Sequence, residues 1–174
     1  FFKACAIAER QGFKGARWMK MTDPSAVEAP SKVGSFLIWQ QPHFIYMAEL
    51  LYRANPSQEV LDKYKDLVAA TAEFMYSFAT YDELEGRFVL KGAIPAQETL
   101  RAADTVNPPF ELSYWHYAIS VAQKWRERLG LERNLQWDEM LDKLSPLAYQ
   151  DGLYLAAETA TDTYKDIRFT SDHM

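Results

Sequence analysis

The sequence predicts an all-α fold, a partial (α/α)6 toroid built from helical hairpins with inner and outer helices, plus a short β element. Segments with apolar residues at helical spacing alternate between helices that are apolar on nearly every side and helices with one polar face. A short turn joins the two helices of a hairpin, whereas the longest loops lead into the apolar helices. We therefore expect the apolar helices inside and the amphipathic helices outside.

The first predicted helix spans residues 2–10, because apolar residues recur there at helical spacing and Gln11-Gly12 provides a stop signal. Residues 14–34 predict a long loop, since Gly and Pro interrupt the segment repeatedly among Thr, Asp and Ser. Long loops inside compact domains often carry function.

The first hairpin begins with a helix predicted from Ser35 to about Ala54, which is apolar on nearly every side and is therefore expected to be buried. Pro42 in its first turns removes a backbone donor and leaves residues 39–43 as an irregular start. Asn55-Pro56 ends this helix, and Ser57 caps an amphipathic helix predicted over residues 57–81.

The second half repeats this plan. Residues 86–92 alternate briefly and predict a short strand, and a loop over 93–107 follows. A second inner helix is predicted from Pro108 to a C-terminal cap at Gly130. A shorter amphipathic helix starts at Asn134 or Gln136 and ends at Pro146, and residues 152–158 predict a strand or an extended run.

The 174 residues hold fewer hairpins than a closed ring needs, and the final residues are polar and loop-like without a helix stop. We therefore expect residues 1–174 to be a single piece of a larger α/α-barrel catalytic domain, truncated at both ends. The remainder of that barrel in the parent chain is then an expected partner.

Composition narrows the function classes. The net charge is −5 and a basic footprint for phosphates is missing, so no nucleic acid is expected as a partner. No apolar run is long enough to predict a membrane span. Cys5 is the single cysteine and no Cys/His cluster has ligand spacing, so neither an internal disulfide nor a structural zinc is expected. No metal site and no cofactor is predicted. The aromatic fraction of 14% is high, as in sites that bind flat ligands such as sugars. No signal peptide is visible, so the compartment stays open.

Glu98, in the loop over 93–107, is the candidate catalytic residue. In a toroid this loop would crown the mouth of the cavity, where desolvation raises the pKa of a carboxyl group. A neutral carboxylic acid can protonate a departing glycosidic oxygen, and a second carboxylate roughly 6.5–9.5 Å away activates water in an inverting mechanism. The alternative is that Glu98 is a solvated loop residue or a cap for nearby amides.

Three segments together resemble one family: GFKGARW near the start, IWQQPHFIYMAELLYR on an inner helix, and PAQE followed by an Asn that opens the next inner helix. They look like the catalytic (α/α)6 barrel of glycoside hydrolase family 65, which contains trehalose, maltose and kojibiose phosphorylases with some hydrolases. The resemblance covers residues 6–158, no more than roughly half of a full barrel, and implies a carbohydrate substrate.

The resemblance also implies roles for single residues. Trp18 would floor a sugar subsite, Glu98 matches the general acid of a GPDEYH segment, and Asp104 and Asn107 match the polar stretch that follows. The pattern departs from the family by one extra residue between Pro95 and Glu98, by Thr-Leu in place of Tyr-His, and by two prolines after Asn107. In the family the base or phosphate site comes from later hairpins, so the resemblance implies that this piece alone is inactive.

Further candidates for sugar binding lie at a helix start and in the long loop. Trp39, Gln41 and His43 form an aromatic and polar cluster that either faces a cavity mouth or caps the helix that follows. Asp23, with Lys20 nearby, either binds a sugar or closes a local turn.

Two candidates lie on the second inner helix. Glu111, one turn in, either bonds sugar hydroxyls or stabilises the helix dipole. Trp115 is followed by His116 and Tyr117, and three consecutive residues point in different directions around a helix, so at most one or two of them face a ligand.

These observations predict a glycoside hydrolase fragment that cleaves an oligosaccharide or disaccharide with inversion, with Glu98 as general acid. One alternative is an inverting disaccharide phosphorylase of the same fold. An alternative of another class is a non-catalytic helical interaction module whose aromatic surface binds protein, against which stands the absence of a repeated signature.

Overall fold

The computed structural model describes residues 1–31, 33–96 and 99–166, and the chain divides into two compact units. The first, here called the helical unit, comprises Phe1–Trp18, Gln41–Phe78 and Trp115–Asp142. The second, here called the loop unit, comprises Met19–Gln40, Ala79–Tyr114 and the described part of Lys143–Met174. Long helices dominate the described residues, as the sequence predicts, and two small sheets accompany them.

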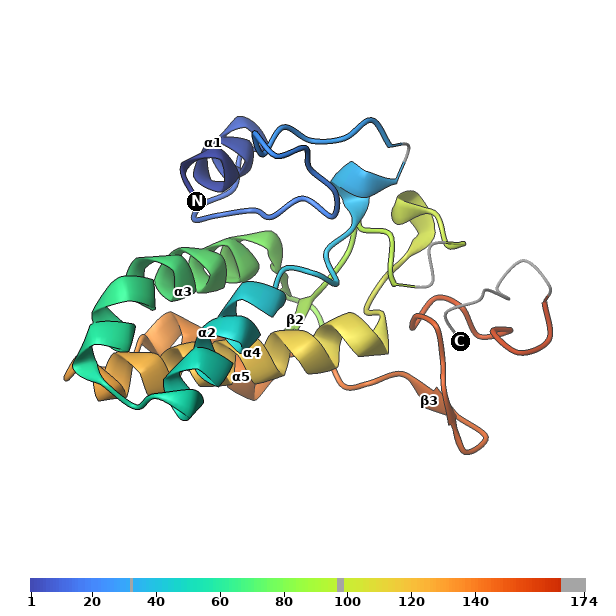
Figure 1. The fold of residues 1–174 in the computed structure, drawn as a ribbon. Coiled ribbons are helices and arrows are strands. Elements are labelled where there is room, and N and C mark those ends of the chain that lie inside the picture. Colours follow the sequence, from blue (N-terminus) through green and yellow to red (C-terminus); the bar gives the residue numbers. More distant parts are fainter. Residues whose placement is uncertain (32, 97–98, 167–174) are drawn as a thin grey trace. The chain divides into compact units, whose positions relative to one another are not determined.

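The helical unit contains α1 (Phe2–Arg10), α2 (His43–Ala54), α3 (Gln58–Phe78), most of α4 (Pro109–Arg128) and α5 (Leu135–Lys143) (Figure 1). The boundaries of α1 are those predicted. A three-residue turn joins α2 to α3, and these two helices pack against each other as the predicted hairpin. The start predicted for α5 is also confirmed, because the Asn134 carboxamide oxygen accepts the backbone N–H groups of Gln136 and Trp137.

The predicted helix start at Ser35 is wrong, because α2 begins only at His43. Residues Gly34–Phe36 form a 3-10 turn, and Leu37 forms a parallel bridge with Ile94 in the loop unit. These contacts hold the segment in extended form. Pro42, which lacks an N–H, precedes the first helical turn, as expected for a residue that delays the helix.

The expectation that this helix is buried on every side is also wrong. Only Ile45, Ala48 and Glu49 of α2 are buried. The opposite side exposes an apolar stripe made of Tyr46, Met47, Leu50 and Leu51, each between 42% and 50% exposed. We call these four residues the α2 stripe.

The helix predicted over residues 57–81 ends earlier, at Phe78. Thr80–Asp82 forms strand β1, which pairs antiparallel with β2 (Arg87–Val89). The Asp82 carboxylate accepts the N–H groups of Leu84 and Glu85 and thereby closes the turn between the strands. The partner strand was missed because only the segment 86–92 shows clear alternation.

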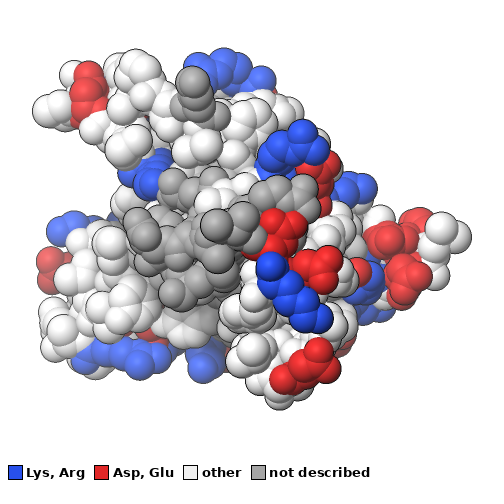
Figure 2. Space-filling model, turned by 90° about the vertical axis from the view of Figure 1, so that its right-hand side faces the viewer, with Lys and Arg blue, Asp and Glu red and all other residues white. Residues whose placement is uncertain are grey.

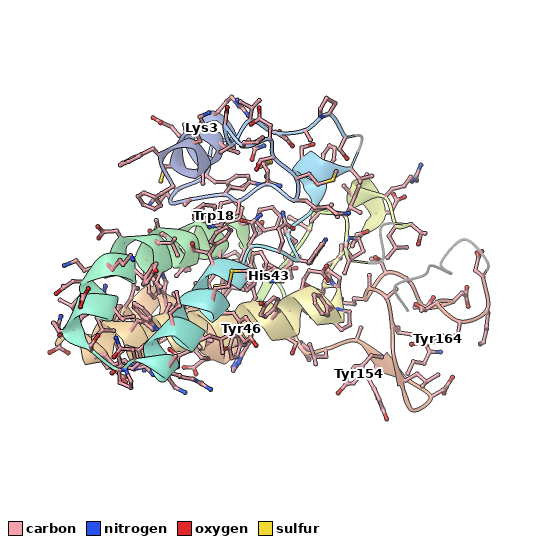
Figure 3. The ribbon with its side chains drawn as sticks, in the orientation of Figure 1. Lys3, Trp18, His43, Tyr46, Tyr154 and Tyr164 are labelled. Carbon is pink, nitrogen blue, oxygen red and sulfur yellow. The ribbon has the colours of Figure 1, made fainter. Side chains whose placement is uncertain are left out.

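The loop unit is held by short pairings rather than by long elements. Besides β1–β2 it contains the 3-10 turn Ala102–Asp104 and a hairpin of β3 (Tyr149–Gln150) and β4 (Leu153–Tyr154). Single bridges join Phe88 to Leu144 and Lys91 to Val106. The hydroxyl of Tyr164 donates to the backbone carbonyl of Tyr154 at 2.6 Å and ties the end of the described chain to this hairpin (Figure 3).

The core of the helical unit lies where α3 and α4 meet. Trp115 on α4 is fully buried and its indole N–H donates to the Met75 carbonyl on α3 at 3.0 Å. Gln123 of α4 is also buried, and its carboxamide bonds the Asn134 backbone and the Asp138 carboxylate, which attaches the start of α5. The buried side chains of Trp115 and Gln123 therefore pair their polar groups with neighbouring elements of this core.

Glu49 of α2 is the one buried carboxylate of this core, 1% exposed. Trp125 and Arg128 of α4 donate to it at 2.9 Å and at 2.6 and 3.1 Å, and Arg53 of α2 donates at 2.8 Å. Burial alone would raise its pKa, but the hydrogen bonds from Arg128, Arg53 and Trp125 outweigh burial and lower the pKa to about 2. The carboxylate thus joins α2 to α4.

We predict that Glu49→Gln lowers the free energy of unfolding by about 3 kcal/mol, because it leaves Arg128 without its anion. Glu59→Gln, at an exposed position of α3, should change it by less than about 0.5 kcal/mol. Urea denaturation measures both.

The same measurement against pH gives a second readout. Because folding lowers the pKa of Glu49, its stabilisation is present above pH 4.5 and is lost as the pH falls toward 2. A difference between the parent chain and Glu49→Gln that stayed constant from pH 7 down to pH 2 would contradict the assignment.

Candidate functional site

The segment after α1 that carries the GFKGARW motif lies directly on α3. The N–H of Ala16 donates to the Ala70 carbonyl at 2.8 Å. Gly15 has a φ of +72°, and a Cβ atom there would lie 2.1 Å from the Ala70 oxygen and 2.5 Å from the Phe74 nitrogen. Only glycine permits this approach, so the motif has a structural reason inside the helical unit.

Trp18, the predicted floor of a sugar subsite, is held from both helices of the hairpin. Its indole N–H donates to the Thr71 hydroxyl of α3 at 2.9 Å, and its ring stacks on Phe44 of α2 with centroids 3.8 Å apart. The side chain is half-buried. Figure 3 shows Trp18 beside the start of α2, near His43. A rigid, partly exposed indole is a suitable surface for a sugar ring.

Gln41 holds the backbone of Trp18. It is fully buried, its carboxamide oxygen accepts the backbone N–H of Trp18 at 2.8 Å, and its carboxamide nitrogen donates to the backbone carbonyl of Trp18 at 2.6 Å. His43 opens α2 and is half-buried, and burial lowers its pKa, so the neutral imidazole is favoured near neutral pH. Trp115 lies in the core described above. Four of the predicted site residues therefore lie in the helical unit, and two of them, Gln41 and Trp115, are fully buried.

In the loop unit, Asn107 is fully buried and has a φ of +51°. The N–H of Leu90 donates to its side-chain oxygen at 2.9 Å, and its own N–H donates to the Leu90 carbonyl at 2.8 Å. Its side-chain nitrogen donates to Glu158 at 2.8 Å. These reciprocal bonds close the base of the loop over residues 91–106.

Glu158 extends this cluster. Its carboxylate accepts two hydrogen bonds from the Arg87 guanidinium, at 2.8 and 3.0 Å. The Arg87 hydrogen bond lowers the pKa of Glu158, burial opposes this, and Asn107 adds to it. Sequence reasoning missed Arg87 and Glu158, because the two lie 71 residues apart and no local pattern pairs them.

The remaining candidates of this unit lie near the surface or in turns. Asp104 is exposed and bonds Arg101 at 2.6 Å, while its backbone carbonyl accepts the Thr159 hydroxyl at 2.7 Å. The carboxylate of Asp23 accepts the Val27 N–H at 2.9 Å and so stabilises a turn of the long loop. Lys20 and Trp39 are both half-buried.

Glu111, in the first turn of α4, is the buried carboxyl group among the described residues of the loop unit, 1% exposed. Its Oε1 accepts the Ala96 N–H at 2.6 Å, and its Oε2 is buried without a hydrogen-bond partner among the described residues. Burial raises its pKa to about 7, although hydrogen bonds from the backbone of Ala96 and of Glu111 itself oppose the shift. Glu98 lies outside the described residues.

No group of three or more His, Cys, Asp or Glu side chains that could hold a metal ion occurs among the described residues. The described helices include none with the length and apolar character needed to span a membrane. On the face drawn in Figure 2, the described acidic and basic side chains are interspersed.

A solved structure described as "Putative kojibiose phosphorylase from human microbiome" matches this fold with a TM-score of 0.73 and 13% sequence identity. The match covers 90% of this chain and 25% of that chain, so this chain spans a quarter of that protein's length. No family model and no curated protein matches the sequence. At this identity the likeness shows the fold, and it confirms the predicted class, a partial α/α toroid.

We predict that Gly15→Ala lowers the free energy of unfolding by about 3 kcal/mol or more. The new Cβ would clash with the α3 backbone at Ala70 and Phe74, so the segment that follows α1 would have to move away from α3. Gly12→Ala is the matched control: its φ is +80°, yet no described atom lies within 4 Å of the Cβ position. It should cost only about 1 kcal/mol of backbone strain. Equal losses in urea denaturation would show that the close approach is not the reason for Gly15.

We predict a pH-dependent effect of Glu111→Gln on stability. Because folding raises the pKa of Glu111, its carboxyl contributes fully below pH 4.5, and the contribution is lost as the pH rises through about 7. The parent chain should therefore lose stability relative to Glu111→Gln between pH 5 and pH 8, by about 3 kcal/mol at most. Urea denaturation at the two pH values measures this, and an unchanged difference would refute the neutral buried carboxyl.

Proposed function

We propose that this chain is part of an enzyme that cleaves a glycosidic bond of an oligosaccharide or disaccharide with inversion, and that Glu98 is its general acid. The observation that carries the proposal is the likeness of fold, over 90% of the chain, to a solved structure whose description names a kojibiose phosphorylase. The sequence PAQE in the loop before α4 supports the choice of Glu98.

In this mechanism Glu98 donates a proton to the glycosidic oxygen as the bond to the anomeric carbon breaks. A nucleophile attacks that carbon from the opposite face, activated by a base that stands roughly 6.5–9.5 Å from the acid. We place this base in later hairpins of the parent chain, so the piece alone would be inactive.

The candidate side chains then divide into two roles. Trp18 offers an aromatic face to a pyranose ring, and His43, Trp39, Lys20, Asp23 and Asp104 supply further surface and hydrogen bonds. Gln41, Asn107 and Trp115 are buried, so we give them supporting roles: Gln41 holds the backbone of Trp18, Asn107 closes the base of the loop, and Trp115 packs the core.

We further propose that the rest of the barrel in the parent chain covers the α2 stripe. Four adjacent apolar side chains on one helix are costly to leave in water. This chain spans only a quarter of the solved relative, which leaves room for neighbouring helices. The stripe is where such a helix would pack.

Phosphorolysis is the second candidate, favoured by the description of the solved relative as a phosphorylase. In that case inorganic phosphate, not water, attacks the anomeric carbon, and the product is a sugar 1-phosphate. The acid keeps the same role in both reactions, so the two candidates differ in the nucleophile and in whether a base or a phosphate site accompanies it.

The test is turnover of disaccharides and oligosaccharides by the full-length protein, with and without inorganic phosphate. Glu98→Gln should lower kcat by two orders of magnitude or more. Glu85→Gln, an exposed glutamate in the turn between β1 and β2, should leave kcat unchanged.

The products decide between the two candidates. A free reducing sugar formed without phosphate supports hydrolysis, and a sugar 1-phosphate that forms only with phosphate supports phosphorolysis. Undiminished turnover of Glu98→Gln would reject Glu98 as the acid.

A further inference from the structure

The loop over residues 91–106 is closed at its base and needs a separate anchor in its middle. At the base, Leu90 and Asn107 exchange two hydrogen bonds, and Lys91 bridges to Val106. The sixteen residues between Leu90 and Asn107 would otherwise keep considerable conformational freedom. A defined position for residues far from the base therefore requires further contacts.

The structure shows such contacts at residues 94 and 96. The N–H of Ile94 donates to the Phe36 carbonyl at 2.9 Å, in the bridge between Leu37 and Ile94. Two residues later the N–H of Ala96 donates to Oε1 of Glu111 at 2.6 Å. The hydrogen bond from Ile94 fixes one side of the loop, and the Glu111 side chain of α4 fixes Ala96.

A buried carboxyl group such as that of Glu111 is an unusual acceptor for the backbone N–H of a loop residue. It is 1% exposed, and its Oε2 is buried without a partner among the described residues. Leaving a buried polar oxygen unsatisfied costs about 1–3 kcal/mol. A glutamate that served only the dipole of α4 would gain more from an exposed carboxylate, since the dipole favours the charged form. The burial instead suits the task of reaching Ala96.

We propose that Glu111 is a positioning residue: its carboxyl holds the backbone of Ala96, and the catalytic role that we propose for Glu98, two residues further along the chain, depends on this contact. This inference rests on the proposed function, in which Glu98 is the acid. Glu111 itself does not touch the reacting atoms; it acts through the backbone of Ala96. Burial raises the pKa of Glu111 to about 7, although the hydrogen bond from Ala96 opposes this shift.

The test compares two variants of the full-length protein. Glu111→Gln keeps a carbonyl oxygen that can accept the Ala96 N–H, whereas Glu111→Leu keeps a similar volume but offers no acceptor. Because the side chain is buried, an apolar replacement preserves packing and folding better than a truncation to alanine. Ser113→Ala, at an exposed position of the same helix turn, is the control.

The first readout is amide hydrogen exchange at Ala96, which needs no activity. Glu111→Leu should accelerate exchange at Ala96 tenfold or more, while Glu111→Gln and Ser113→Ala stay within threefold of the parent. The second readout is kinetics: Glu111→Leu should lower kcat at least tenfold with KM changed less than threefold, and Glu111→Gln should restore most of kcat.

The two readouts separate this inference from the proposed function. Unchanged exchange at Ala96 in Glu111→Leu overturns the positioning role, whatever happens to activity. Faster exchange without any loss of kcat also overturns it, because the loop would then be held for no catalytic purpose. Faster exchange with reduced kcat in Glu111→Leu, but full activity in Glu98→Gln, would keep Glu111 as a positioning residue and reject Glu98 as the group it serves.

Discussion

The buried carboxylate of Glu49 is the constraint on which the helical unit depends. A charge inside a core is tolerated only when it is paired, and Trp125 and Arg128 of α4 supply the pairing from 76 and 79 residues away. An almost wholly apolar helix could bury any of its sides. Because Glu49 must face α4, the rotation of α2 about its axis is decided, and the α2 stripe is turned outward.

The loop unit follows the same rule with different means. It has few backbone hydrogen bonds between strands. Side-chain amides and carboxyl groups therefore form the hydrogen bonds that its buried backbone groups need. Asn107 serves Leu90, and Glu111 serves Ala96. Polar residues that look in the sequence like ligands for a sugar are thereby committed to the backbone. Gln41, which bonds both backbone groups of Trp18, is the corresponding case in the helical unit.

Local signals predicted much of the fold. The Gln11-Gly12 stop, the Asn134 cap and the two prolines at the start of α4 all act through the backbone of their immediate neighbours, and the structure has helix ends at these places. Errors arose where a distant segment competes. The segment from Ser35 has helical spacing, but its pairing with the strand-like Ile94 keeps it extended. The end of α3 was placed too late because β1 exists only through its pairing with β2.

The sequence by itself determined the helical periods, the turns, the all-α class and the chemical types available near the predicted cavity mouth, since all of these depend on neighbours along the chain. Only the tertiary structure decided which side of α2 is buried, which side-chain amides already bond the backbone, and that Glu111 is a buried carboxyl group and not an exposed carboxylate at a helix end. Whether a side chain is buried and which group it bonds depends on residues tens of positions away in the sequence. Local sequence patterns do not predict such contacts.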